Sequence, residues 1–128
     1  MILDSSAVVA ILLREPEYES LLAKVAAASA VGIGVPTLSE AAIVLSARIQ
    51  GDARGWLARF LTEASVVTVP FGDMHWAAAV DAWLRYGKGR HRANLNFGDC
   101  LAYATAKVSG EPLLLVGEGF ARTDIEIV

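Results

Sequence analysis

The sequence contains a single cysteine, Cys100, among its 128 residues, so no disulfide can form within the chain. A lone thiol is typical of a protein that works in a reducing compartment, and we expect a cytoplasmic location. No apolar run is long enough to span a bilayer, and Asp4 comes too early for the apolar core of a secretory signal. These absences exclude a disulfide scaffold and favour a protein with no membrane partner.

A strong excess of charge of one sign is also missing. Charged residues make up 20% of the sequence and the net charge is −3, which argues against a protein that simply coats nucleic acid. A local basic site on an acidic body stays compatible with this balance. Hydrophobic residues make up 55% of the chain, enough for a folded core. The length suits one core, so we expect residues 1–128 to form a single domain.

Several common catalytic motifs are absent. His75 and His91 lack the HExxH spacing of a zinc enzyme, and no phosphate-binding GxxxxGK[ST] loop occurs. The glycine pair Gly32 and Gly34 lacks the third glycine and the acid of a dinucleotide site. We expect Cys100 to be a small buried side chain and not a nucleophile. Carboxylates therefore become the main candidates for chemistry.

Apolar strand-like runs alternate with helix-like stretches along the chain. This alternation predicts an α/β fold with a parallel sheet covered on both faces. The predicted strands are residues 1–3, 30–35, 66–69, 112–116 and 124–128, and the predicted helices are residues 5–13, 17–28, 37–49, 52–64, 73–86 and 97–109.

Three acids, Asp4, Glu40 and Asp99, each fall near the start of a predicted helix, and at least two follow a predicted strand. In a parallel sheet such positions converge at the carboxyl ends of the strands. Because crowded carboxylates repel one another, a cluster there favours a bound cation. Mg²⁺ and Mn²⁺ prefer oxygen ligands, and either ion can activate a water and stabilise a leaving oxygen.

Each acid also has a purely structural interpretation. Thr37-x-x-Glu40 has the form of a capping box, Asn96-x-x-Asp99 has a similar form, and Asp4 precedes two serines as an N-cap would. The two interpretations are compatible, since the positive partial charge at a helix N-terminus helps to keep a carboxylate ionised.

A basic segment precedes Asp99. Residues 85–92 contain four of the 11 lysines and arginines of the chain and no acid. Lys88, Arg90 and Arg92 are therefore candidates for contacts with the phosphates of a nucleic acid, although a solvated loop has the same composition.

Aromatic residues give a weaker signal. Tyr86 could stack on a base, but one aromatic side chain is little evidence. Trp56 belongs to the apolar pattern of one predicted helix, and Trp76 and Trp83 belong to that of another. We expect all three in the core or in a dimer interface and not on a binding platform.

Specific segments of the sequence resemble a known family. They are residues 2–7, 15–17, 37–41, 87–91, 95–104, 112–115 and 117–120, and Asn-Phe-Gly-Asp-Cys at residues 96–100 is the most specific of them. Over nearly its whole length the chain is similar to the PIN-domain ribonucleases of the VapC toxin type, from bacterial toxin–antitoxin pairs.

This resemblance implies a PIN-like α/β/α sandwich with a central, mainly parallel sheet. It implies a Mg²⁺- or Mn²⁺-dependent endoribonuclease that cleaves cellular RNA and inhibits translation and growth. Asp4, Glu40 and Asp99 match the metal-binding and catalytic acids of the family. The implied partners are the RNA substrate, a cognate VapB-type antitoxin, and a second copy in a homodimer, with operator DNA bound only through the antitoxin.

One position departs from the family pattern. Members often carry a fourth acid or amide just before the phenylalanine that Phe120 matches, and this chain has Gly119 there. Glu118 is our candidate for a replacement, and Asp124 is another. The departure keeps open an alternative, a catalytically weak PIN-like module that binds RNA or antitoxin.

Another alternative is an α/β domain in which an aspartate is phosphorylated. Such a domain would need paired acids after the first strand, and Asp4 has no acidic neighbour, so we disfavour it.

Overall fold

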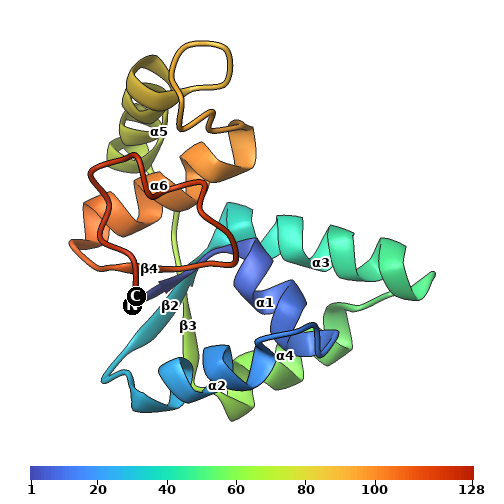
Figure 1. Ribbon diagram of the computed structural model, residues 1–128. Coiled ribbons are helices and arrows are strands. Elements are labelled where there is room, and N and C mark those ends of the chain that lie inside the picture. The colour runs from blue at the N-terminus through green and yellow to red at the C-terminus, as the bar shows by residue number, and fades with distance from the viewer.

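A four-stranded parallel sheet lies at the centre of the computed structural model, which describes all residues from Met1 to Val128 (Figure 1). The spatial order of the strands is β3-β2-β1-β4, and every pairing is parallel. The strands are β1 (Ile2–Leu3), β2 (Val31–Gly34), β3 (Val66–Val69) and β4 (Leu113–Leu114). The predicted α/β class with a parallel sheet is confirmed.

Six helices connect and cover these strands. They are α1 (Ser5–Leu12), α2 (Tyr18–Ala27), α3 (Val35–Ile49), α4 (Arg54–Glu63), α5 (Asp73–Tyr86) and α6 (Phe97–Ser109). None of these helices is long and apolar enough to cross a membrane.

Most predicted elements differ from the observed ones by one or two residues at an end, and two of the differences have a clear physical reason. The predicted helix over residues 37–49 begins at Val35, because Pro36 suits the first turn of a helix and needs no hydrogen bond there. The predicted last strand, residues 124–128, reduces to one bridge between Ile127 and Leu113. Since β4 has only two residues, it offers few groups for a further strand to pair with.

The two faces of the sheet bury different apolar clusters. Leu3 and Ile33 face a cluster formed with α1, α2, α3 and α4, whereas Ile2 and Leu113 face a cluster formed with α5 and α6. This division follows from the alternation of side chains along a strand. Figure 1 shows α5 and α6 together on one side of the sheet and α1, α2 and α4 on the other. The predicted covering of both faces is confirmed.

Gly34 of β2 lets α6 pack closely over the sheet. A Cβ atom on Gly34 would collide with the hydroxyl of Thr105, which is itself buried on α6. Gly32 faces other neighbours, since a Cβ atom there would lie 3.1 Å from a methyl group of Val69 on the adjacent strand β3. The missing side chain of Gly34 therefore brings α6 against β2, with the N-terminus of the helix near the carboxyl edge of the sheet.

Candidate active site

Asp4 directly follows β1 and is the N-cap of α1. Its side chain is only 6% exposed, and Oδ2 accepts hydrogen bonds from the backbone N–H of Ser6, at 3.1 Å, and from the Ser6 hydroxyl. Ser6 Oγ in turn accepts a hydrogen bond from the N–H of Val116, at 3.0 Å. The predicted cap is confirmed. The other carboxylate oxygen of Asp4 accepts none of the hydrogen bonds within the protein.

Asp99 lies in the first turn of α6 and forms the predicted capping box. The Asp99 N–H donates to Asn96 Oδ1 at 2.8 Å, and Asp99 Oδ2 accepts from the Asn96 N–H at 2.9 Å. Burial raises the pKa of Asp99, and the nearby charge of Asp4 raises it further, although the hydrogen bond from Asn96 works against both. Like Asp4, Asp99 keeps one oxygen outside its cap.

The capping box predicted at Thr37 and Glu40 is wrong. Because α3 begins at Val35, with Gly34 as an N-cap that offers no side chain, Thr37 already lies inside the helix. Thr37 is 1% exposed, and its hydroxyl oxygen has no hydrogen-bond partner. Glu40 consequently falls in the second turn of α3, where no cap needs its carboxylate.

Glu40 points instead toward the start of α6. A Cβ atom built on Gly98 would lie 2.7 Å from Oε2 of Glu40, so the absence of a side chain at Gly98 makes room for this carboxylate. Partial burial raises the pKa of Glu40, and the charges of Asp4 and Asp99 add to the increase, while a hydrogen bond from the Ser5 side chain lowers it in part. Three acids from three separate elements thus act on one another.

No cation of the protein neutralises this cluster. All six ion pairs of the structure involve other acids. The only atoms that Asp4, Glu40 and Asp99 offer to a metal ion are carboxylate oxygens. Mg²⁺ and Mn²⁺ prefer oxygen ligands to nitrogen or sulfur, so this set suits either ion.

The carboxylates do not form a finished metal site. The structure has no group of three or more His, Cys, Asp or Glu side chains arranged to hold a metal ion. Two of the three acids use one oxygen as a helix cap, so their remaining oxygens, together with water, are the available ligands. The chemistry of the donors fits a divalent ion that keeps part of its water shell.

The two candidates for a fourth acid lie in different surroundings. Glu118 is exposed on the turn after β4, and no contact in the structure joins it to the three acids. Asp124 accepts hydrogen bonds from the Tyr103 hydroxyl and from Lys107, both at 2.8 Å, and Arg85 lies 3.6 Å away. Burial works against ionisation, but the bonds from Lys107 and Tyr103 prevail and lower the pKa of Asp124 to about 2. The structure therefore does not bring Asp124 to the cluster.

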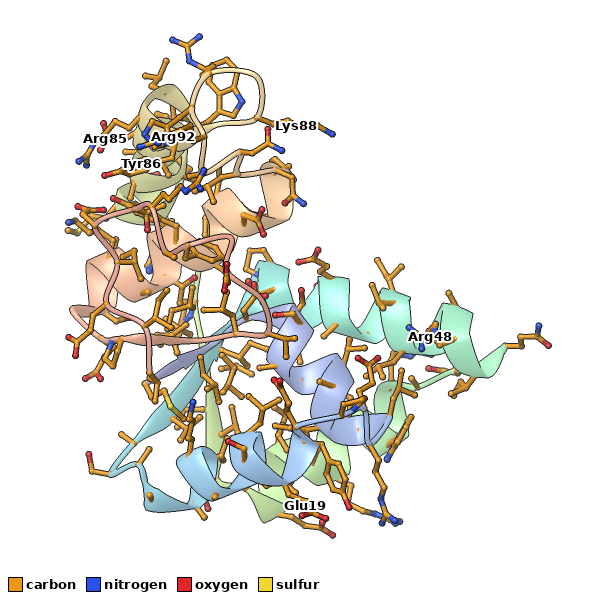
Figure 2. All side chains as sticks on the ribbon, viewed as in Figure 1. Glu19, Arg48, Arg85, Tyr86, Lys88 and Arg92 are labelled. Atoms are coloured by element: carbon orange, nitrogen blue, oxygen red, sulfur yellow. The ribbon has the colours of Figure 1, made fainter.

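The basic segment is an exposed loop tied to the start of α6. A bridge between Gly87 and Leu95 closes the loop directly before Asn96. Lys88, Arg90 and Arg92 are all exposed, and Figure 2 shows Lys88 extending outward from the loop. The cations are thus joined to the helix that carries Asp99.

Contacts within this loop hold one of its cations in place. The Arg90 guanidinium lies 4.7 Å from the centre of the Trp83 ring, and its Nε donates to the carbonyl of Leu84 at 3.3 Å. Tyr86 packs against the rings of His91 and Tyr103, so it is not a free stacking surface.

The tryptophans contradict part of the sequence-based expectation. Trp56, Trp76 and Trp83 are 37%, 58% and 43% exposed, so none belongs to the core. Helical spacing predicts an apolar face on a helix, but it does not show whether another element packs against that face. Cys100, in contrast, is buried as expected.

Sequence reasoning missed two residues of the site. Ser6 joins Asp4 to the segment after β4, and Gly98 makes room for Glu40. A glycine at the second position of a helix is an unfavourable choice, and this was the available signal for Gly98.

Comparison with known proteins identifies the family of this chain. The family model of the PIN domain matches residues 1–126. Ribonuclease VapC36 of Mycobacterium tuberculosis is 46% identical over 127 residues, which cover 98% of this chain and 91% of that protein.

Two solved structures share the fold. One is M. tuberculosis VapC20, described as a sarcin–ricin loop cleaving toxin, with a TM-score of 0.79 at 17% identity, covering 99% of this chain and 97% of that one. The other is a toxin–antitoxin complex from Klebsiella pneumoniae, with a TM-score of 0.73 at 15% identity, covering 99% and 95%. At these identities the likeness concerns the fold, whereas the family match and the curated relative extend along nearly the whole sequence. The chain belongs to the PIN-domain family and, within it, to the VapC ribonucleases.

Proposed function

We propose that this chain is the toxin of a toxin–antitoxin pair, an endoribonuclease that cleaves cellular RNA with Mg²⁺ or Mn²⁺ and thereby inhibits translation and growth. The observation that carries the proposal is the cluster of Asp4, Glu40 and Asp99, which meet from three elements with no protein cation among them. Membership of the VapC ribonucleases supports RNA as the substrate.

Each residue of the site has a distinct role in this proposal. Asp4, Glu40 and Asp99 hold the divalent ion, directly or through water. When bound, the ion supplies a water of lowered pKa and stabilises the charge on the leaving oxygen. Ser6 and Asn96 fix the orientation of two of these carboxylates through the cap hydrogen bonds.

The basic loop binds the phosphate backbone in this proposal, through Lys88, Arg90 and Arg92. Packing on Trp83 limits the motion of Arg90 before RNA arrives, which lowers the entropy cost of the contact.

Glu118 is the proposed fourth acid. Two hydrogen bonds support this proposal, from the Val116 N–H to the Ser6 hydroxyl and from the Asp4 N–H to the Leu114 carbonyl, because they join the segment just before Glu118 to the start of α1. A glutamate side chain is longer than an aspartate, which compensates for its position one residue before Gly119. We expect Glu118→Gln to lower the cleavage rate less than a substitution of Asp4 or Asp99.

The test is cleavage of purified RNA by the wild-type chain and by an Asp4→Asn/Asp99→Asn double variant. We expect cleavage in Mg²⁺ or Mn²⁺, none with EDTA, and none by the double variant. Thermal unfolding gives an independent measure of the ion, because a ligand that binds only the folded state raises the melting temperature. The ion should raise it for the wild type and not for the double variant. Full cleavage by the double variant would overturn the proposal.

Partners and context complete the proposal. The partner is a VapB-type antitoxin, which binds operator DNA on behalf of the pair, and the complex works in the cytoplasm. The Klebsiella pneumoniae complex supports an antitoxin partner for a chain of this fold. Residues 1–128 act as a single PIN domain. Co-expression with the product of the adjacent gene should suppress both toxicity and cleavage.

The proposed homodimer uses the exposed start of α5. Met74 is 72% exposed and Trp76 58%, and large apolar side chains exposed together on one helix mark an interaction surface. Trp76→Glu should shift a concentration-dependent dimer toward the monomer in sedimentation equilibrium. A wild-type chain that stays monomeric at all concentrations would exclude the dimer.

A second candidate function is a PIN-like binding module without turnover. Gly119 and the absence of a finished metal site favour it. It predicts retention of RNA in gel-shift assays and no cleavage in Mg²⁺ or Mn²⁺.

A further inference from the structure

An apolar groove opens between α5 and α6, at the start of the helix that carries Asp99. Its cavity volume is about 440 Å³. Its lining is mainly apolar and comes from α5, the basic loop and the first turns of α6, and it includes Trp83, Lys88, Leu95, Asn96, Phe97 and Cys100. The groove contributes nothing to the chemistry described for Asp4, Glu40 and Asp99, so its composition needs a separate explanation.

Phe97 lines this groove from the first turn of α6, the turn that also carries Asp99. Its side chain is 78% exposed, although it is followed directly by Gly98, which contacts Glu40, and then by Asp99. An exposed phenylalanine at the start of a helix gains little from burial.

The apolar contact that fixes the start of α6 does not use Phe97. The apolar pair that often fixes the entry into a helix lies one residue before the cap and at the fourth helical position. Here Leu95 and Cys100 occupy those positions, and both are buried in the same cluster. Phe97 therefore has no evident structural role at the start of α6.

The opposite wall of the groove is a rigid aromatic ring. Trp83 is 43% exposed, and the Arg90 guanidinium lies over its ring. A Cβ atom on Gly87 would be 2.6 Å from the same indole, so the backbone of the loop packs tightly against it. These contacts hold Trp83 in one orientation before any ligand arrives.

The polar groups at the groove match an anion beside an aromatic ring. Lys88 takes part in none of the six ion pairs, and no acid lines the groove. Asn96 uses its side-chain oxygen to cap α6, while its amide nitrogen donates none of the hydrogen bonds within the protein. An apolar protein segment would leave both donors unsatisfied, whereas a nucleotide would use them.

We infer that this groove is a nucleobase subsite, in which one unpaired base of the RNA substrate lies between Phe97 and Trp83, with Lys88 on the adjoining phosphate. The inference rests on the proposed ribonuclease function and deepens it. Because a base must leave its helix to enter such a groove, the subsite selects single-stranded or looped RNA. The nucleotide is then held at the start of α6, whose first turn also carries Asp99.

The test compares RNA with bases and RNA without them. The probes are a fluorescein-labelled decamer of riboadenosine and an abasic ribose-phosphate decamer, and binding is measured by fluorescence anisotropy in the Asp4→Asn background, which prevents cleavage. We expect Phe97→Leu to weaken binding of the adenosine decamer about tenfold. Its affinity for the abasic decamer should stay within about twofold of the parent protein. Phe97→Trp should restore the loss, since it returns an aromatic face.

Two matched variants separate stacking from charge and from general aromatic loss. Lys88→Gln should weaken binding of both decamers, because it removes a phosphate contact. Trp56→Leu, on α4 and outside the groove, should change neither. Equal effects of Phe97→Leu on both decamers, or no effect on either, would overturn the subsite.

Two further results would also overturn it. One is equal affinity of the parent protein for the two decamers. The other is a Phe97→Leu variant whose oligomeric state changes while its affinity for the adenosine decamer does not fall relative to the abasic decamer. That result would identify the groove as an interface with a second copy. Failure of the ribonuclease proposal is distinct, since it would appear as absence of metal-dependent cleavage while base-dependent binding persisted.

Discussion

The chain contains two acidic centres with opposite electrostatics. At the carboxyl edge of the sheet, Asp4, Glu40 and Asp99 lie together without a protein cation, and burial raises the pKa of both Glu40 and Asp99. Near the C-terminus, Asp124 meets Lys107 and the Tyr103 hydroxyl, and its pKa falls to about 2 despite partial burial.

This difference separates two uses of a carboxylate. Asp124 holds the last segment of the chain against α5 and α6, and its charge is compensated within the protein. The cluster at the sheet edge has no such compensation, so its charge is available to an external cation. Uncompensated carboxylates decrease stability and are the pattern expected of a functional site.

The largest expected effect is on cleavage. Asp99→Asn should reduce the cleavage rate by about a hundredfold or more, since it removes a charged ligand of the proposed ion while an asparagine oxygen can still accept the hydrogen bond from Asn96. Initial rates on a defined RNA in Mg²⁺ measure this. Asp124→Asn serves as the control, and its cleavage rate should stay within about twofold of that of the wild type. Equal losses in the two variants would remove the distinction between the two centres.

The next effect is on stability at the other centre. Asp124→Ala should lower the free energy of unfolding by about 1–3 kcal/mol, because it leaves the buried hydroxyl of Tyr103 without an acceptor. Urea denaturation measures this, and the cleavage rate should not change. Adding Tyr103→Phe should recover part of the stability, since no donor is then left unsatisfied. A lack of recovery would mean that the ion pairs with Lys107 and Arg85 carry the effect.

A smaller effect is expected from Gly98→Ala. The new methyl group would lie 2.7 Å from Oε2 of Glu40 and would displace that flexible carboxylate. We expect about a tenfold loss of cleavage rate with the fold intact. Gly55→Ala is a matched control at the same position of α4, where no atom lies within 4 Å, and it should leave cleavage unchanged. An active Gly98→Ala protein would show that Glu40 does not need its present place.

The smallest effect is on the pH dependence of stability without metal. Raised pKa values for Glu40 and Asp99 mean that the folded protein binds more protons than the unfolded chain between about pH 4 and the raised values. Stability should therefore fall as the pH rises through that window, by a few degrees at most in melting temperature.

Asp124 predicts the opposite trend at lower pH. Its lowered pKa gives stability that is present above about pH 4 and is lost as the pH falls toward about 2. Calorimetry from pH 2 to 7 measures both trends. Glu40→Gln/Asp99→Asn should abolish only the decline at higher pH, and an unchanged profile in this variant would contradict the assignment.

Much of this organisation could be predicted from the sequence. Asp4 and Asp99 sit beside residues with strong local preferences, so their helix starts were predictable from a few neighbours. The parallel sheet followed from the alternation of apolar runs, because that pattern reflects burial over whole elements.

Other features depend on contacts between distant residues. The first residue of α3 could not be predicted, because Val35 and Pro36 fit either the end of a strand or the first turn of a helix. Packing decides between the two. The exposure of Trp76 could not be predicted, since a helical stripe looks the same whether or not another element covers it. The closeness of Glu40 to Gly98 depends on how α3 and α6 pack, which no local pattern encodes.

The close packing of α6 over β2 has a genetic consequence. If this chain is toxic in cells, survivors of its expression should include substitutions at Gly34 as well as at the acids themselves. Any side chain there would press on Thr105 and lift the helix that carries Asp99. A chain with such a substitution would keep all of its acidic residues. An inspection of those residues alone would therefore wrongly predict an active protein.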